Sequence, residues 1–234
     1  MTAGGPGVVA VGEDRSRDFD DGDVAVWTSV DGITWSRVPH DEAVFGTGQV
    51  TSVTSADSGL VAVGNEGSDG GDDAAVWTSV DGITWSRVPH DEAVFGEAGM
   101  QSVTVGGPGF VAVGTAGSGD DPHAAVWTSV DGVTWSRVSH DEAVFGLRLG
   151  DENGMTGVTV GGPGLVAVGS DGDAAAVWTS PDGITWSRVP NTNLTFGAGG
   201  ISSVTFGGPG LVTVGASDSE DDVHAAVWVL VPED

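Results

Sequence analysis

Three near-identical loops each place a histidine beside two acids, and these residue types bind divalent metals. The triplets are His40-Asp41-Glu42, His90-Asp91-Glu92 and His140-Asp141-Glu142. A repeated metal site and the copying of one loop would both produce this pattern, so both interpretations stay open. The best Ca²⁺ candidate is the acidic segment that contains Asp18, Asp20 and Asp23, because carboxylate oxygens are the ligands that Ca²⁺ prefers. No other cofactor is predicted.

Few residue types are available for catalysis of bond cleavage. The chain contains no Cys and no Tyr, and all seven of its basic Lys and Arg positions are arginines. A Cys nucleophile, thiolate metal ligands and a disulfide framework are therefore excluded. A glycosidase that works through two carboxylates stays open, because the chain has 34 Asp and Glu residues. No catalytic residue is identified, and the sequence favours a protein that is not an enzyme.

The candidate residues belong to a sequence repeat. A tryptophan closes an apolar run about every 50 residues, at Trp27, Trp77, Trp127, Trp178 and Trp228. The segment 26–46 returns unchanged at 76–96. Such a period indicates one supersecondary unit that is copied in a stack or ring, and that buries its apolar faces against its neighbours.

Each repeat contains four strand-like segments. In the third repeat they are 102–105, 110–114, 124–129 and 134–138, and an Asp-Gly hairpin turn separates the last two. Four antiparallel strands in about 50 residues predict a blade of a β-propeller, and a β-solenoid is the alternative. The predicted fold is therefore an all-β, five-bladed propeller of four-stranded antiparallel blades.

One domain is predicted over 1–234, and its blade boundaries follow the repeat. The blades are expected at about 1–46, 47–96, 97–146, 147–197 and 198–234. The first blade has a clipped inner strand, and the last blade lacks its outer strand. Closure of a ring would therefore need face-to-face packing of these two blades, or a second chain.

The hairpin turns carry a Ser-x-Asp-Gly-x-Thr-Trp motif that resembles the Asp-box repeat of bacterial neuraminidases and of related propellers such as the sortilin ectodomain. The turn is one residue shorter than the commonest form in that family. The resemblance implies a sialidase-like propeller in which the motif is structural, without sialidase chemistry, because the family's sialidases use a Tyr nucleophile. The matching residues are Ser29, Asp31, Gly32, Thr34, Trp35, Ser79, Asp81, Gly82, Thr84, Trp85, Ser129, Asp131, Gly132, Thr134, Trp135, Ser180, Asp182, Gly183, Thr185 and Trp186.

The formal net charge of −27 is concentrated on one predicted face. Most acids lie in loops after second and fourth strands, and these loops leave an antiparallel blade on the same side. Solubility and salt adaptation, cation binding, and docking of a basic protein are three explanations for this acidic face. Nucleic acid is excluded as a partner because its phosphates would meet a strongly negative field.

Targeting signals are not found in the sequence. The segment 1–5 lacks the charged and apolar regions of a signal peptide, and no apolar run approaches the roughly 20 residues of a membrane span. We expect a soluble protein without a membrane partner, and the sequence assigns no compartment. It is expected to be a monomer or to associate with itself through the incomplete end blades.

The copying of the repeat is broken at a few positions, and neutral drift of surface loops and a ligand-binding rim both explain these breaks. Those positions are Leu147, Arg148, Leu149, Asp151, Glu152, Asn191, Asn193, Arg15 and Arg17, with Arg148 as the anchor. The predicted function is a non-catalytic binding or scaffold module with an acidic loop face, whose partner is a protein or a glycan. The alternatives are a glycan-active hydrolase of the sialidase-like class and a purely structural product of repeat amplification.

Overall fold

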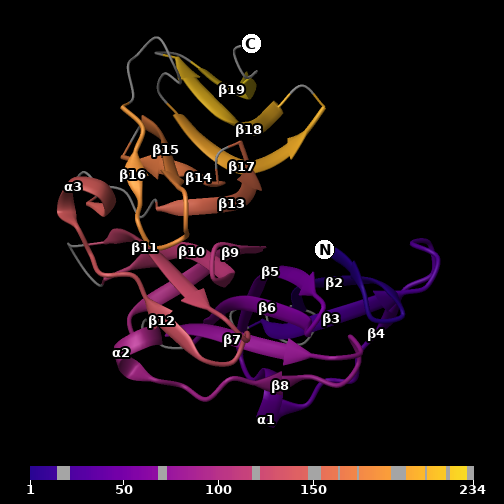
Figure 1. Ribbon diagram of the computed structural model, residues 1–234. Coiled ribbons are helices and arrows are strands. Elements are labelled where there is room, and N and C mark those ends of the chain that lie inside the picture. Colours follow the sequence, from indigo (N-terminus) through magenta and orange to yellow (C-terminus); the bar gives the residue numbers. More distant parts are fainter. Residues whose placement is uncertain are drawn as a thin grey trace.

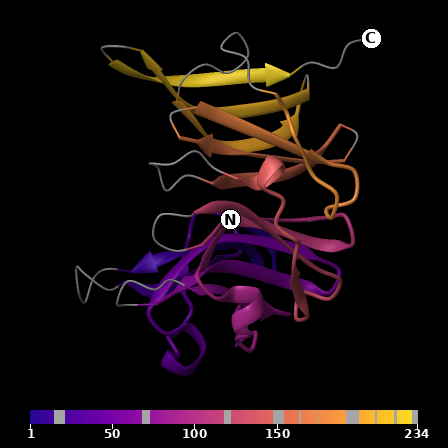
Figure 2. The same cartoon turned by 90° about the vertical axis from the view of Figure 1, so that its left-hand side faces the viewer.

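Five antiparallel sheets follow one another along the chain, and each is one blade of an all-β, five-bladed propeller. The computed structural model describes residues 1–14, 22–67, 73–117, 122–146, 154–162, 164–172, 174–190, 199–208, 210–219 and 222–230. The blades succeed one another along an arc, with the first blade at one end and the fifth at the other (Figure 1). Seen from the side, the fifth blade is again at the far end from the first (Figure 2).

The first three blades each have four strands in sequence order. Blade 1 contains β1 (Thr2–Gly4), β2 (Gly7–Asp14), β3 (Asp23–Ser29) and β4 (Ser36–Arg37). Blade 2 contains β5 (Gly48–Ala56), β6 (Gly59–Glu66), β7 (Asp73–Ser79) and β8 (Ser86–Arg87). Blade 3 contains β9 (Ala98–Gly106), β10 (Gly109–Ala116), β11 (His123–Ser129) and β12 (Trp135–Arg137).

The last two blades differ in strand number. Blade 4 contains β13 (Met155–Gly161), β14 (Gly164–Asp171), β15 (Ala174–Ser180) and β16 (Ser187–Arg188). Blade 5 contains β17 (Gly199–Gly207), β18 (Gly210–Ser219) and β19 (Asp222–Leu230). The clipped first strand of blade 1 and the three-stranded sheet of blade 5 agree with the sequence prediction.

The core consists of four apolar layers, one between each pair of successive blades. In the first layer, Val9 and Val26 of blade 1 pack with Leu60, Trp77 and other residues of blade 2. The same pattern recurs between blades 2 and 3, 3 and 4, and 4 and 5. No such layer joins blade 5 to blade 1 among the described residues.

The repeated tryptophans of the third strands lie in these layers. Trp77, Trp127 and Trp178 are completely buried. The indole N–H of Trp77 donates to the carbonyl of Val44 in the preceding blade at 2.8 Å, and Trp127 and Trp178 make the equivalent bonds to Val94 and Val144. The 50-residue spacing of the tryptophans thus reflects one hydrogen bond that links each blade to the blade before it.

Three one-turn helices occur where the sequence predicted only loops. They are α1 (Glu42–Phe45), α2 (Glu92–Phe95) and α3 (Glu142–Phe145). In each case the preceding aspartate is the N-cap, and its carboxylate accepts the N–H of the alanine two residues on. A single turn is too short to show helical periodicity. The only sequence signal for these helices was an Asp at the N-cap position followed by Glu in the first turn.

The innermost strands hold successive blades together through polar groups. Thr51 in β5 donates its hydroxyl to the carbonyl of Met100 in β9 at 2.7 Å, and the Val103 N–H donates to Ser52 Oγ at 3.2 Å. Thr156 in β13 makes the corresponding bond to Ile201 in β17 at 2.6 Å.

No helix in the described part of the chain is long and apolar enough to span a membrane.

Candidate functional site

An acidic cavity of about 420 Å³ lies between blades 1 and 2, on the side of the loops that follow second and fourth strands. Helix α1 and the next residues form one wall, and the ends of β6, β7 and β8 form the other. Glu42, Glu66 and Asp73 contribute carboxylates to the lining, and Arg87 forms an ion pair with Glu66. The single arginine does not neutralise the lining, so the cavity favours positively charged groups.

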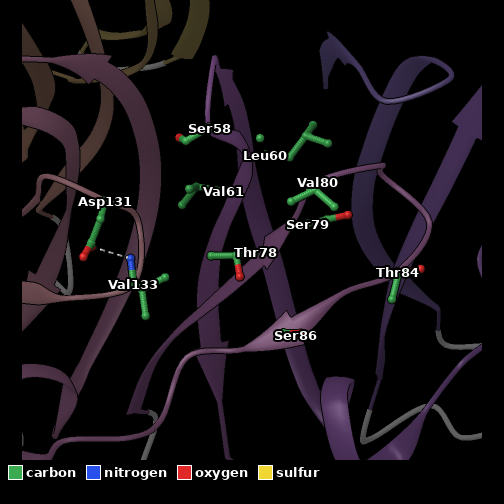
Figure 3. A pocket seen from close by; sticks show the side chains of 11 residues that line it. Ser58, Leu60, Val61, Thr78, Ser79, Val80, Thr84, Ser86, Asp131 and Val133 are labelled. Atoms are coloured by element: carbon green, nitrogen blue, oxygen red, sulfur yellow. Dashed lines mark hydrogen bonds between the residues drawn. The ribbon is translucent and has the colours of Figure 1, made fainter.

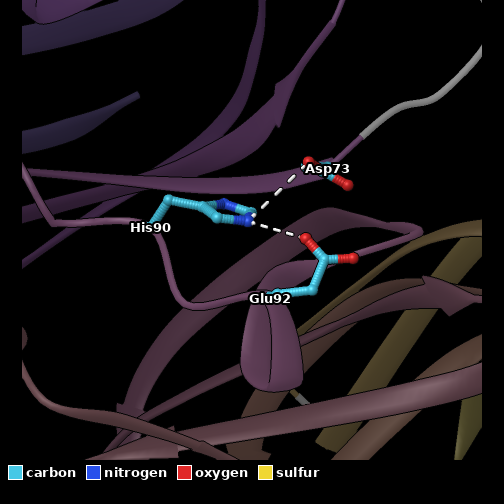
Figure 4. A group of neighbouring side chains, drawn as sticks. All are labelled: Asp73, His90 and Glu92. Carbon is cyan, nitrogen blue, oxygen red and sulfur yellow. Dashed lines mark hydrogen bonds and ion pairs between the residues drawn. The ribbon is translucent and has the colours of Figure 1, made fainter.

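Beside this cavity, Asp73, His90 and Glu92 form a cluster of potential metal ligands (Figure 4). One ligand atom from each lies within 4.8 Å of the other two. His90 Nε2 is 3.2 Å from Glu92 Oε2 and 3.8 Å from Asp73 Oδ2. Ligands in a tetrahedral zinc site with bonds near 2.1 Å are about 3.4 Å apart, so a divalent cation fits with small adjustments.

Neighbouring groups orient two of these three side chains, Asp73 and His90. Asp73 Oδ1 accepts the backbone N–H of Glu97 at 2.9 Å, so Oδ2 is the oxygen turned toward His90. Glu97 has a φ of 47°, the only positive φ outside glycine in the described part of the chain. The ring of His90 lies against Phe95 of α2, with 6.2 Å between ring centroids. The Glu97 amide and the Phe95 ring thus orient Asp73 and His90 within the cluster.

Blade 1 has the same three residue types at the corresponding positions, Asp23, His40 and Glu42, but the arrangement differs among the blades. In blade 1, His40 Nε2 is 3.1 Å from Glu42 Oε2. In blade 3, His123 occupies the position of Asp73, and its ring meets His140 edge-on at 4.3 Å between centroids. Among the described residues, only blade 2 brings three ligand atoms of this kind together.

The Ser-x-Asp-Gly turns between third and fourth strands form an internal hydrogen-bond network. Asp81 Oδ1 accepts the N–H groups of Ile83 at 2.8 Å and Thr84 at 2.7 Å, and Ser79 Oγ accepts the N–H of Gly82 at 2.8 Å. The other three turns repeat these bonds. The carboxylates are therefore occupied with the backbone of their own turns.

Hydrogen bonds from these backbone amides stabilise the charged form of each turn aspartate. The bonds from Thr84 and Ile83 lower the pKa of Asp81 to about 2. The pKa values of Asp31 and Asp131 fall to about 2 for the same reason, and that of Asp182 is also lowered. An acid held in this way is charged at all ordinary pH values and is poorly suited to proton transfer.

The tryptophans that end the motif lie beside their own turns. The indole N–H of Trp85 donates to the carbonyl of Gly82 at 3.1 Å, and Trp135 and Trp186 do the same with Gly132 and Gly183. These three side chains are 6% exposed, whereas Trp35 of the end blade is 36% exposed. The motif residues are thus engaged in turn and blade contacts.

A second cavity, of about 280 Å³, lies where the turn of blade 3 covers blade 2 (Figure 3). Its lining is mainly Ser, Thr, Val and Leu, with Asp131 as the one charged residue. Asp131 Oδ1 already accepts the Val133 N–H at 2.8 Å. This cavity therefore offers no ionic group that is free for chemistry.

Three of the four fourth-strand arginines bind acids of their own blades. Arg37 pairs with Asp14, Arg87 with Glu66, and Arg188 with Asp171. In blade 3 the acid is replaced by Ala116, and Arg137 lies over the ring of Trp127 at 5.4 Å, where burial lowers its pKa. An arginine cluster for a substrate carboxylate is not formed by these four residues.

Most of the predicted ligand positions lie outside the described residues. These are Leu147, Arg148, Leu149, Asp151, Glu152, Asn191, Asn193, Arg15 and Arg17 of the rim, with Asp18 and Asp20 of the Ca²⁺ segment. Asp23 is described, at the start of β3, where it bridges to Thr47. The rim and Ca²⁺ hypotheses therefore stay predictions.

The sequence did not single out Asp73 as a partner of His90, because the two are 17 positions apart.

Comparisons with known proteins add a fold likeness. Neither a protein-family model nor a curated protein matches the chain. A candidate glycosidase from Bacteroides thetaiotaomicron VPI-5482 is similar in structure, with a TM-score of 0.51 and 16% identity over 93% of this chain and 81% of that chain. At this identity, the likeness shows a shared fold and not a shared chemistry.

Two further solved structures are more distant. A candidate glycoside hydrolase from Parabacteroides distasonis ATCC 8503 has a TM-score of 0.47 and 15% identity, over 73% of this chain and 62% of that chain. The β-1,2-mannobiose phosphorylase from Listeria innocua has a TM-score of 0.49 and 12% identity, over 88% and 65%. The chain thus spans less than two thirds of the length of these two proteins.

Proposed function

We propose that this chain is a non-catalytic propeller module that binds a positively charged ligand on its acidic loop face. The observation that carries the proposal is the cavity between blades 1 and 2, where Glu42, Glu66 and Asp73 face one arginine. Carboxylates that line a concave surface attract cations and basic side chains. The cluster of Asp73, His90 and Glu92 at its edge adds ligands for a divalent cation. A basic protein segment is the proposed macromolecular partner.

The inner strands support a non-catalytic role. The described strands β1, β5, β9, β13 and β17 contain no Asp and no Glu. These strands lie nearest to one another in the arc, and they present Ser, Thr, Val and Gly instead. Glycosidase chemistry would need two carboxylates at a set separation. In the described part of the chain they would have to come from the second or third strands or from the loops.

The four hydrogen-bonded turns support a relationship to Asp-box propellers as part of the same proposal. Each turn aspartate accepts two backbone amides and each turn serine accepts a third. This arrangement stabilises a hairpin and leaves no reactive group. The proposal therefore assigns the Ser-x-Asp-Gly-x-Thr-Trp residues to folding and the acidic cavity between blades 1 and 2 to binding.

A binding experiment tests the proposed site directly. A lysine-rich peptide, titrated into the protein in a calorimeter at low and high salt, should bind more weakly to Asp73→Asn than to the wild type. Asp57→Asn is the matched control, because Asp57 is an exposed acid in the β5–β6 turn, away from the loop face. Equal losses for the two variants would show only a general charge effect and would contradict a defined site.

A glycan-active hydrolase is the second candidate, supported by the fold shared with the candidate glycosidase. Its acids would be Glu66 and Asp73, which line the same cavity. Incubation with aryl glycosides and with β-1,2-mannobiose, with and without phosphate, should release no product if the module is non-catalytic. Turnover that is lost in Asp73→Asn and kept in Asp57→Asn would favour the hydrolase instead.

A further inference from the structure

The two ends of the arc expose surfaces that are buried everywhere else in the molecule. We call the side of a blade that packs on the following blade its forward face, and the side that packs on the preceding blade its rear face. Val63, Val113 and Val168 on internal forward faces are 0% exposed. The equivalent residue of blade 5, Val214, is 44% exposed, and the nearby Val227 is 65% exposed.

The rear face of blade 1 is exposed in the corresponding way. Trp35 is 36% exposed, compared with 6% for Trp85 in blade 2. Trp27 is only partly buried, whereas its counterpart Trp77 is fully buried. Blade 1 therefore presents two tryptophans at the place where every later blade meets its predecessor.

We infer that a second copy of this chain docks head to tail, with the forward face of blade 5 against the rear face of blade 1. The same forward-to-rear contact already occurs four times within the chain. Val227 corresponds to Val26, which packs in the cluster that contains Trp77 and Trp85. Because the blades are near copies, Val227 of one copy should meet Trp27 and Trp35 of the next. Such a contact is heterologous, and it forms rings or open chains of copies.

Charge and strand number make this contact weaker than an internal one. Each copy carries a formal charge of −27, so the copies repel each other at low salt. The described part of blade 5 has three strands and no one-turn helix, so it offers no counterpart to the Val44 carbonyl that binds Trp77. We therefore expect association that strengthens with salt and is detectable at protein concentrations on the order of 100 μM.

Sedimentation of complementary variants tests both the contact and its direction. Val227→Glu places a charge on the forward face of blade 5, and Trp35→Glu does so on the rear face of blade 1. Val130→Glu is the matched control, because Val130 is 77% exposed in the turn of an internal blade. Circular dichroism melts of all three variants check that each is folded.

The expected results distinguish head-to-tail docking from every other arrangement. Wild type and Val130→Glu should form oligomers, and Val227→Glu and Trp35→Glu should each be monomeric. An equimolar mixture of the last two should form a one-to-one dimer, because each retains one intact face. A wild type that stays monomeric at high salt would overturn the proposal. Self-association of Trp35→Glu alone would also overturn it, because forward faces would then be pairing with each other.

Discussion

At the scale of single residues, the tryptophan that ends each turn motif combines burial with a hydrogen bond. Trp85 is 6% exposed and donates its indole N–H to Gly82. Replacing it with alanine should cost about 3–5 kcal/mol of unfolding free energy, because a large cavity opens between blades 1 and 2. Urea denaturation measures this loss. Trp35→Ala is the matched control, and an equal loss there would show that burial is not the cause.

The turn aspartates give a prediction about acid stability. Backbone amides lower the pKa of Asp81 in the folded state to about 2, below its ordinary value of 3.8. Its stabilising contribution is therefore present above pH 4 and is lost as the pH falls toward 2. Asp81→Asn should lower the melting temperature at pH 6, and the difference from wild type should shrink between pH 4 and 2.

Asp57→Asn serves as the control for general charge relief, because it removes one exposed acid outside the four Ser-x-Asp-Gly turns between third and fourth strands. Melting curves recorded by circular dichroism from pH 2 to pH 6 provide the measurement. A difference between Asp81→Asn and wild type that stays constant over this range would show that the carboxylate charge does not stabilise the turn.

At the scale of elements, a glycine in the second strand of blades 2 to 5 permits the irregular pairing with the first strand. A Cβ on Gly114 would lie 2.0 Å from the carbonyl oxygen of Gly99, at the register shift between β9 and β10. A Cβ on Gly99 would meet nothing closer than 3.9 Å. Gly114→Ala should therefore cost about 1–3 kcal/mol in urea denaturation, with Gly99→Ala as the tolerated control. Similar losses for the two would contradict the steric explanation.

Strands and turns were readable from the sequence because each has a short-range signal. The 50-residue period, the short strand-like segments and the Asp-Gly turns predicted four strands in a blade, and the structure has them in blades 1 to 4. Helices α1 to α3 were missed because one turn has no period. Which blade gathers three metal ligands could not be predicted, because it depends on how Asp73 approaches His90 across the blade.

At the scale of the whole molecule, charge should dominate the response to salt. Added NaCl should raise the melting temperature, because it screens repulsion among the 34 acids. CaCl₂ at matched ionic strength should raise it further through a specific site, and neutralising Asp18, Asp20 and Asp23 together should remove that increment. Equal melting temperatures in the two salts would remove the Ca²⁺ hypothesis.

A zinc titration of His90→Ala and His40→Ala separately tests the blade 2 cluster.

The hydrogen bond from each buried tryptophan to the preceding blade also gives the chain an order of assembly during synthesis. The carbonyls of Val44, Val94 and Val144 are made before the tryptophans that bind them. When a blade leaves the ribosome, the carbonyl that accepts its indole N–H is therefore already present, and the hydrogen bond does not depend on any later blade. Neighbouring blades are nearly identical and could pair wrongly. Folding from the N-terminus lets each blade pack on the preceding blade before the next, similar blade is made and can compete for that contact.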